Sequence, residues 1–213
     1  MGRRLKFDMP GPDWRRELGD FRETPREAFF GTPSGCLLVV EVGFGRGEFL
    51  VQQAQAHPDH VFLGIEVSWK RCLKLARRLA RTEIANVRLL ADPAEEVLGD
   101  GLREGEVETF WVNFPDPWPK ARHARRRFVR PDTIARVARC LRPAGLLHAA
   151  TDDPDYATQI HEVLAGEASL KNVHATAWVD EVPGRMPTAY ELEWRAEGRR
   201  MHYFSYRRRE ASA

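Results

Sequence analysis

The sequence has only three cysteines among its 213 residues, and they stand far apart at positions 36, 72 and 140. An odd number without a paired-cysteine spacing argues against a disulfide framework and against a structural zinc site. We therefore expect Cys36, Cys72 and Cys140 to be packing residues, and we predict that the protein holds no metal.

A long apolar run is also missing. No stretch of about 18 apolar residues occurs, so no helix is expected to span a bilayer. The first residues, MGRRLKFDMPGPDWRR, are basic but lead into no apolar segment, which argues against a secretory signal. We expect a cytoplasmic protein without a membrane partner.

Arginine, in contrast, is abundant. It supplies 28 of the 33 basic residues, although the formal net charge is only +2. The arginines stand in blocks, and a local basic face is enough to attract a polyphosphate partner. Genomic base composition or heat tolerance explains the same excess equally well, so composition alone leaves a nucleic acid partner open.

Strand-like and helix-like segments alternate along the chain. Apolar runs that suit buried parallel strands are each followed by helical periodicity, and two further strands near the C-terminus are expected to pair antiparallel around a long loop. This pattern predicts an α/β fold with a doubly wound, mostly parallel, seven-stranded sheet. The predicted strands are 36–42, 61–67, 86–92, 108–114, 146–152, 171–179 and 201–207.

The first 35 residues lack sustained periodicity and are rich in proline, glycine and charge. We predict an N-terminal basic arm over residues 1–35, whose order stays open, and one domain over residues 36–213. Within the arm, a short helix is expected from Thr24 to Phe30. Thr24 and Glu27 have capping-box spacing, and Pro25 falls at the first helical position.

Carboxylates end several of the predicted parallel strands. In a doubly wound sheet the ligand lies outside the carboxyl ends of the strands, where the strand order reverses. Glu66 is placed to accept hydrogen bonds from a ribose diol, and Asp92 could take an adenine amino group. Several carboxylates in one pocket disfavour a pyrophosphate and favour a ligand with a positive centre, such as S-adenosylmethionine. The candidate residues are Glu41, Glu66, Asp92, the segment 113–116 and Asp152.

A glycine turn follows the first predicted strand. Gly43, Gly45 and Gly47 stand between that strand and a predicted helix at 48–56, where backbone amides can approach a ligand closely. We take Gly43 and Gly45 as candidate cofactor-binding residues. The third glycine comes one residue too early for a dinucleotide fingerprint, which counts against a nicotinamide enzyme. A plain strand-to-helix turn without a ligand is the alternative interpretation.

The segment 113–131 places an aspartate between two prolines and a run of basic residues behind it. Pro115 and Pro117 restrict the backbone around Asp116, so its carboxylate has little freedom. The basic run could grip phosphates while a base enters the pocket. Alternatively, these arginines form a solvated helix face. The basic residues are Lys120, Arg122, His123, Arg125, Arg126, Arg127 and Arg130.

These motifs together resemble the bacterial tRNA (guanine-N7)-methyltransferases. The resemblance runs from about Leu38 to Tyr206 and rests on EVGFGRGEFL, FLGIEV, FPDPWPKARHARRR, LRPAGLLHAATD and the TAYE segment at 188–191. It implies a Rossmann-like, S-adenosylmethionine-dependent methyltransferase fold. It also implies methyl transfer to N7 of a guanosine in the variable loop of tRNA.

The resemblance also implies roles for single residues. Glu41, Glu66, Asp92 and Asp116 match positions that contact S-adenosylmethionine, and Asp116 also matches the catalytic position. The positions assigned to the tRNA substrate are Lys120, Asp152, Thr188, Ala189, Tyr190 and Glu191. Two departures, Pro93 in place of alanine and Glu193 in place of a basic residue, concern substrate affinity rather than the reaction.

The chemistry of this reaction indicates what a carboxylate would do. Guanine N7 carries a free lone pair at neutral pH, so the enzyme must align the reacting atoms and stabilise a cationic purine rather than remove a proton. Asp116, and secondarily Asp152, are predicted to orient the base. Asp152 could instead simply cap the helix that begins near Pro154.

Two other functions stay open. One is methyl transfer to an exocyclic amino group, whose usual motif the segment 113–116 only approximates. The other is a noncatalytic RNA-binding adaptor that retains the fold, against which the carboxylates at 41, 66, 92 and 116 count. The sequence leaves open whether the protein is a monomer or a homodimer.

Overall fold

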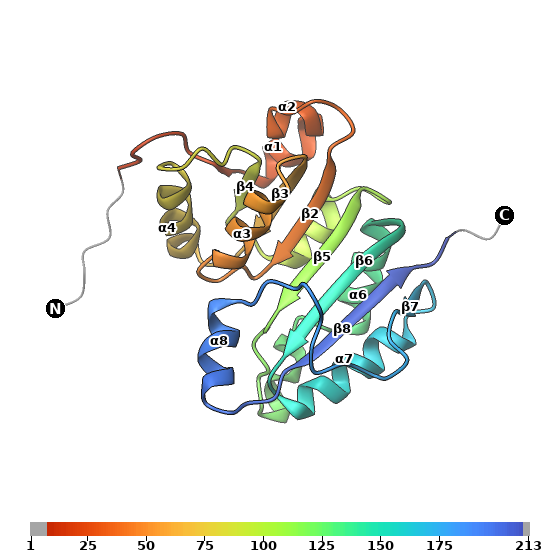
Figure 1. Cartoon of the computed structure of the whole chain (residues 1–213). Coiled ribbons are helices and arrows are strands. Elements are labelled where there is room, and N and C mark those ends of the chain that lie inside the picture. The colour runs from red at the N-terminus through yellow and green to blue at the C-terminus, as the bar shows by residue number, and fades with distance from the viewer. Residues whose placement is uncertain (1–7, 211–213) are drawn as a thin grey trace.

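An eight-stranded sheet forms the centre of the structure, a computed structural model that describes residues 8–210 (Figure 1). The strands lie in the order β1-β4-β3-β2-β5-β6-β8-β7. They are β1 (Arg15–Arg16), β2 (Leu37–Val42), β3 (His60–Ile65), β4 (Val87–Leu90), β5 (Val107–Asn113), β6 (Leu141–Thr151), β7 (Leu170–Asn172) and β8 (His202–Arg208).

Helical segments connect these strands. The helices are α1 (Leu18–Glu23), α2 (Arg26–Phe30), α3 (Glu48–Ala56), α4 (Trp69–Leu79), α5 (Ala94–Glu96), α6 (Pro131–Cys140), α7 (Pro154–Gly166) and α8 (Ala189–Ala196). A π-helical segment η1 (Val97–Gly101) follows α5, and a 3-10 helix η2 (Ala121–Arg126) precedes α6. Among residues 8–210, no helix is long and apolar enough to cross a membrane.

The predicted sheet type is confirmed. The pairings among β1 to β6 are all parallel, whereas β8 runs antiparallel to both β6 and β7. In Figure 1 the arrow of β8 points in the direction opposite to that of β6. Helix α3 spans the residues predicted for it, 48–56.

The sheet has one strand more than the seven predicted. The additional strand, β1, consists of two residues of the segment predicted to be an arm, and it pairs with Leu89 and Leu90 at the edge of the sheet. Two residues are too few to show an alternation of apolar and polar side chains.

The predicted strand 171–179 is also largely absent. β7 ends at Asn172, and farther along only Val179 forms an isolated bridge, to Tyr203.

Residues 18–30 pack into the core rather than lying apart from it. Leu18, Phe21, Phe29 and Phe30 are buried in the same apolar cluster as the central strands. The rings of Phe21 and Phe29 meet edge to face with their centroids 5.0 Å apart. This segment therefore covers part of one face of the sheet.

The helix predicted from Thr24 begins at Arg26, and its capping box is not formed. The Thr24 amide donates to the Asp20 carbonyl, so Thr24 closes α1 instead. Helix α1 was not predicted, because its six residues hold only two buried side chains and so show little helical periodicity.

Helices cover both faces of the sheet. Val40 of β2 packs in a cluster that includes side chains of α6 and α7, whereas its neighbour Val39 packs in a cluster with side chains of α3 and α4. This alternation follows from the two-residue period of a strand. A sheet with both faces covered also explains why its strands appear as continuous apolar runs in the sequence.

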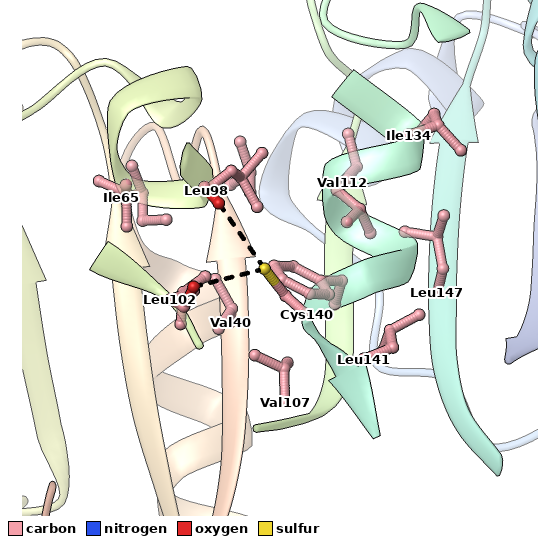
Figure 2. Packing of buried hydrophobic residues seen from close by; sticks show 14 of the residues in the cluster. Val40, Ile65, Leu98, Leu102, Val107, Val112, Ile134, Cys140, Leu141 and Leu147 are labelled. Atoms are coloured by element: carbon pink, nitrogen blue, oxygen red, sulfur yellow. Dashed lines mark hydrogen bonds between the residues drawn. The ribbon is translucent and has the colours of Figure 1, made fainter. Parts of the chain in front are cut away.

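The cysteines have the packing role predicted for them. Figure 2 shows Cys140 among apolar side chains, with Sγ 3.7 Å from the carbonyl oxygen of Leu98. Burial raises the pKa of the Cys140 thiol to about 11 and that of Cys72 to about 12. All three cysteines are free, and Cys36 is partly buried against the main apolar cluster.

The order of the strands locates the ligand site. From β2 the sheet continues to β3 and β4 on one side and to β5 and β6 on the other, so the strand order reverses between β2 and β5. The carboxyl ends of these two strands carry Glu41 and Asn113. A crevice for a ligand is expected at this point in doubly wound sheets.

Candidate active site

The glycine turn lies directly after β2. Gly43, Gly45 and Gly47 have φ values of 71°, 57° and 74°, in the left-handed region that favours glycine. A Cβ atom on Gly47 would also lie 2.4 Å from the side chain of Leu75. The turn therefore needs glycine for its backbone shape, and it brings its amides to the carboxyl edge of the sheet.

Glu41 is a buried carboxylate with one unsatisfied oxygen. Only 3% of the residue is exposed, and Oε1 accepts a hydrogen bond of 3.1 Å from Asn113 Nδ2. Oε2 is buried and accepts no hydrogen bond from the described residues. Burial raises the pKa of Glu41 to about 7, against the opposing effects of the Asn113 hydrogen bond and the Arg185 charge. A buried carboxylate in a cleft that has a raised pKa and an oxygen without a hydrogen bond is a candidate for ligand binding.

Glu66, at the end of β3, links the glycine turn to the start of α4. Its Oε2 accepts a hydrogen bond of 3.1 Å from the Gly45 amide, and its Oε1 accepts one of 3.0 Å from the Ser68 amide. Arg71 lies 3.3 Å from Oε2. These bonds hold the buried carboxylate in one orientation, and because Oε2 accepts from both Gly45 and Arg71, the further lone pair is on Oε1.

Asp92 follows β4 and accepts no hydrogen bond from residues 8–210. Partial burial raises its pKa, and the nearby charges of Glu17 and Glu96 act in the same direction. It lines a hollow of about 360 Å³, which we call the Asp92 cleft. The lining of the Asp92 cleft also includes Glu66, Glu95, Asp116, Trp118 and Arg126.

A second hollow of about 360 Å³ adjoins it, and we call this the Glu41 cleft. Its lining includes Glu41, Arg46, Asn113, Thr188, Tyr190 and Glu193. Gly43, Arg71, Phe114 and Asp116 line both hollows. The two clefts therefore meet at the glycine turn and at Asp116.

Asp116 is held at this junction by its backbone. Phe114 and Trp118, on either side of the Pro-Asp-Pro segment, have φ values of 51° and 42°, which residues other than glycine seldom adopt. Such strain persists only where the surroundings impose it and often marks functional sites. The Asp116 side chain is exposed and accepts no hydrogen bond from residues 8–210. It therefore offers a free carboxylate in a restricted place.

Arg127 supports the loop that carries Asp116. Its Nε donates to the Pro117 carbonyl at 2.6 Å, and its Nη2 donates to the Trp118 carbonyl at 3.4 Å. It also hydrogen bonds to Gln159 of α7, and its guanidinium lies 5.0 Å from the centre of the Tyr156 ring. This arginine, predicted as an RNA contact, is thus half-buried beneath the loop.

The other predicted RNA contacts are exposed. Lys120 precedes η2, which carries Arg122, Arg125 and Arg126. The guanidinium of Arg126 lies 5.0 Å from the centre of the Trp118 ring, at the rim of the Asp92 cleft. A cationic surface therefore borders the mouth of the site.

The segment 188–191 begins α8 and forms a capping box. Thr188 Oγ1 accepts a hydrogen bond of 3.0 Å from the Glu191 amide, and the Glu191 carboxylate accepts one of 3.3 Å from the Thr188 amide. Thr188, Ala189 and Tyr190 line the Glu41 cleft. Glu191 lines neither cleft; its buried carboxylate pairs with Arg185 and Arg195.

Asp152 follows β6, and its carboxylate contacts the hydroxyl group of Tyr190. Its carboxylate accepts a hydrogen bond of 3.3 Å from the Tyr190 hydroxyl and one of 2.5 Å from Arg199. The alternative that Asp152 caps the following helix is wrong, because Asp153 accepts the capping bond of 2.8 Å from the Tyr156 amide. Asp152 therefore positions the exposed ring of Tyr190.

Pro93 and Glu193, the two residues that depart from the family pattern, both line the candidate clefts. Pro93 stands at the amino end of α5 and lines the Asp92 cleft. Glu193 accepts a hydrogen bond of 2.9 Å from Arg46, which connects α8 to the glycine turn across the Glu41 cleft.

The opposite edge of the sheet holds a larger hollow of about 720 Å³, around Trp14, Thr82 and Asn86. The one group in the described range whose donor atoms could together hold a metal ion, His57, Asp59 and His60, also lies at this edge, before β3. Neither feature includes a residue predicted for cofactor or substrate. The clefts at the carboxyl edge are therefore the candidate active site.

Known proteins share both sequence and fold with this chain. The family described as "Putative methyltransferase" matches residues 36–204. A tRNA (guanine-N(7)-)-methyltransferase of Alkalilimnicola ehrlichii is 37% identical over 172 residues, which are 81% of this chain and 73% of that protein. That of Chromobacterium violaceum is 42% identical over 162 residues, 76% of this chain and 69% of that protein. The chain belongs to the tRNA (guanine-N7)-methyltransferase family.

Solved structures of other methyltransferases share the fold. The 16S rRNA methyltransferase KamB superposes with a TM-score of 0.60 at 17% identity, over 82% of this chain and 88% of that one. The antibiotic-resistance methyltransferase Kmr does so with a TM-score of 0.56 at 22% identity, over 84% and 90%. The predicted Rossmann-like methyltransferase fold is confirmed. Membership of the family makes the chain an enzyme of the methyltransferase class.

One supporting residue of the site, Arg185, was not predicted, and another, Arg127, was predicted in a different role. Arg185 hydrogen bonds to Asn113 beside Glu41, and Arg127 holds the Asp116 loop from beneath. Arg185 stands in a segment without periodicity, so nothing in the sequence marked it. The proximity of Arg127 to the Pro-Asp-Pro segment was a signal, but it suggested contact with RNA instead.

Proposed function

We propose that this protein transfers a methyl group from S-adenosylmethionine to N7 of a guanosine in the variable loop of tRNA. The observation that carries the proposal is the position of Asp116, a free carboxylate fixed where two acidic clefts meet. Membership of the tRNA (guanine-N7)-methyltransferase family supports the same reaction. A cytoplasmic location is expected for an enzyme that modifies tRNA.

The clefts fit the proposed cofactor. The orphaned Oε2 of Glu41 matches a cationic amine, as in the methionine part of S-adenosylmethionine. The fixed carboxylate of Glu66 retains acceptor capacity for a ribose diol, and Asp92 offers an acceptor for an adenine amino group. Carboxylates at each of these places favour a cofactor with positive charge and disfavour one with a pyrophosphate.

With the cofactor bound, different residues of the chain would orient the guanine, stabilise its positive charge and contact the nucleotide. The bound cofactor supplies an electrophilic methyl group. Asp116 accepts hydrogen bonds from the N1 and N2 edge of guanine, which orients N7, and its negative charge offsets the positive charge that develops on the purine. No proton leaves guanine in this step. Thr188 and Tyr190 line the wall of the Glu41 cleft and contact the nucleotide.

The cationic rim would bind the tRNA. Lys120, Arg122, Arg125 and Arg126 are exposed beside the mouth of the clefts, where they can contact phosphates. Phosphate contacts supply most of the affinity for nucleic acids and weaken as salt rises. This surface therefore holds the RNA while the base is presented to Asp116.

The proposal is tested with two tRNAs that differ at one atom. One contains guanosine in the variable loop and the other contains 7-deazaguanosine there, which has carbon in place of N7. We expect methyl transfer to the first only, with 7-methylguanosine as the product in nucleoside analysis. Transfer to both would indicate an exocyclic amino group as the acceptor. Cofactor binding without transfer to either would favour the adaptor, and both results would contradict the proposal.

A further inference from the structure

Arg185 is a buried arginine that contacts Asn113, a residue of the Glu41 cleft. It stands in the segment between β7 and α8, and its side chain is 5% exposed. Its guanidinium lies 4.8 Å from the centre of the Tyr203 ring and 5.5 Å from that of Phe49. A charge in such a place requires polar partners, because burial without them is costly.

Arg185 has one polar partner in the Glu41 cleft, Asn113, and one in α8, Glu191. Nη2 donates a hydrogen bond of 2.7 Å to Asn113 Oδ1, and Nη1 pairs with the carboxylate of Glu191. Asn113 in turn uses its Nδ2 to donate to Glu41 Oε1 at 3.1 Å. Because an amide side chain has one acceptor end and one donor end, a donor fixed at Oδ1 directs Nδ2 toward Glu41.

We propose that Arg185 is a positioning residue that, held by Glu191, orients Asn113 and thereby sets the Glu41 carboxylate to bind the amine of the cofactor. The proposal rests on the proposed function, because it takes S-adenosylmethionine as the ligand. It gives Glu191 a role different from the substrate contact that the family resemblance implies. The Glu191 carboxylate faces Arg185, Arg195 and the Tyr203 hydroxyl instead of the clefts.

The chain of contacts also connects the cofactor to α8. Glu191 is the third residue of α8 and closes the capping box with Thr188, which lines the Glu41 cleft. The helix that presents Thr188 and Tyr190 is therefore joined to Glu41 through Glu191, Arg185 and Asn113. One series of contacts thus runs from Glu41 to the wall of the Glu41 cleft that α8 forms.

The charge of Arg185 makes the link measurable through pH. Its positive charge lowers the pKa of Glu41, while burial and the charge of Glu48 raise it. Glu41 must be ionised to pair with an amine, so cofactor binding strengthens as pH rises through its pKa. Removing Arg185 should move that midpoint to higher pH. The other charged groups that line the cleft with Glu41 are Arg46, Glu48, Arg71, Asp116 and Glu193.

The test compares two arginines that share one partner. Arg185 and Arg195 both pair with Glu191, but only Arg185 contacts Asn113. Calorimetric titration of the full chain with S-adenosylhomocysteine, from pH 6 to pH 9, should show binding about fivefold weaker at pH 7 in Arg185→Met, the loss expected if the midpoint of Glu41, about 7 in the wild type, moves up by about one pH unit. The affinity difference should shrink toward pH 9. Arg195→Met should keep the wild-type affinity and midpoint.

Two further measurements separate positioning from a general structural effect. Methylthioadenosine lacks the amino acid part, so Arg185→Met should bind it with wild-type affinity. Arg185→Lys keeps the positive charge and should keep the wild-type pH midpoint, even where its geometry weakens binding. If Arg185→Met fails to fold, the double variant Arg185→Met/Glu191→Gln removes both buried charges and should show the same shift.

The outcomes are distinct. Wild-type affinity and midpoint for S-adenosylhomocysteine in Arg185→Met, or in the double variant where that one is used, would overturn the proposal. An equal loss of affinity for S-adenosylhomocysteine and methylthioadenosine in that variant would also overturn the proposal. If the unaltered protein binds neither ligand, the proposed cofactor itself is wrong and the inference falls with it. If it binds both, the cofactor assignment stands whichever way the variants behave, and methyl transfer is tested separately with the two tRNAs.

Discussion

Two carboxylates of the site, Glu41 and Asp116, are held in opposite ways. Glu41 is buried and is set by a hydrogen bond to Asn113, whereas Asp116 is exposed and is set by the strained backbone on either side of it. Burial gives Glu41 a raised pKa and one unsatisfied oxygen. Side-chain contacts suit a carboxylate that recognises a bound cofactor, and backbone restriction suits one that must stay open to an incoming base.

The largest effect is expected at Asp116. Asp116→Asn removes the charge that offsets the cationic purine, and we expect methyl transfer at saturating substrates to fall at least about 100-fold. Because the side chain is exposed and has no hydrogen-bond partner among residues 8–210, the unfolding temperature should not change. Kinetics and thermal unfolding check both statements. Asp155→Asn, an exposed aspartate on α7, is the control, and a wild-type rate for Asp116→Asn would remove it from the mechanism.

Glu41→Gln should weaken cofactor binding and should stabilise the protein without cofactor against unfolding. Loss of the charged hydrogen bond should weaken S-adenosylmethionine binding roughly 100-fold. The pKa of Glu41 rises from 4.5 to about 7 on folding, so ionisation opposes folding. The wild type should therefore lose stability relative to the variant as pH rises from 4.5 to about 7, by about 3 kcal/mol in all.

Calorimetry with the cofactor and denaturant unfolding at pH 4 and pH 8 measure the two effects of Glu41→Gln. The same free energy of unfolding for both proteins at pH 8 would show that Glu41 is not an unsatisfied carboxylate.

Arg127→Met should slow methyl transfer about tenfold without changing tRNA affinity. Its hydrogen bonds to the Pro117 and Trp118 carbonyls hold the Asp116 loop, and a small displacement of a catalytic group is costly. The measurement is the rate and the tRNA dissociation constant at several salt concentrations. A loss of affinity that diminishes at high salt would instead make Arg127 a phosphate contact.

The smallest effect is expected at the cationic rim. Lys120→Ala should weaken tRNA binding severalfold and reduce the salt dependence of binding by about one phosphate contact. The maximal rate should stay the same, because Lys120 lies outside both clefts. Lys171→Ala, an exposed lysine on β7 at the far edge of the sheet, is the control. Equal effects of the two substitutions would argue against a tRNA surface at η2.

Much of the fold could be predicted from periodicity alone. The parallel strands were predictable because both faces of the sheet are covered, which makes each strand a continuous apolar run. Helix α8 was missed although Thr188 and Glu191 have the spacing of a capping box, the same signal that wrongly placed a helix start at Thr24. The difference lies in tertiary context: Glu191 is fixed by Arg185, whereas Thr24 ends a preceding helix.

The candidate site was predictable at its strand ends but not in its supports. Carboxyl ends of adjacent parallel strands must meet, so Glu41, Glu66, Asp92 and Asp116 were expected along one edge, and the structure brings them to two adjoining clefts. Arg185 contacts a residue 72 positions earlier in the chain. Such a contact depends on how the segment before α8 folds back, which no local pattern encodes.

The division of labour between Glu41 and Asp116 is tested most directly by single-turnover methyl transfer to tRNA at increasing S-adenosylmethionine. Glu41→Gln should need far more cofactor but approach the wild-type rate once saturated. Asp116→Asn should stay slow at every cofactor concentration. A rate for Asp116→Asn that saturating cofactor restores, or one for Glu41→Gln that it does not, would contradict the account.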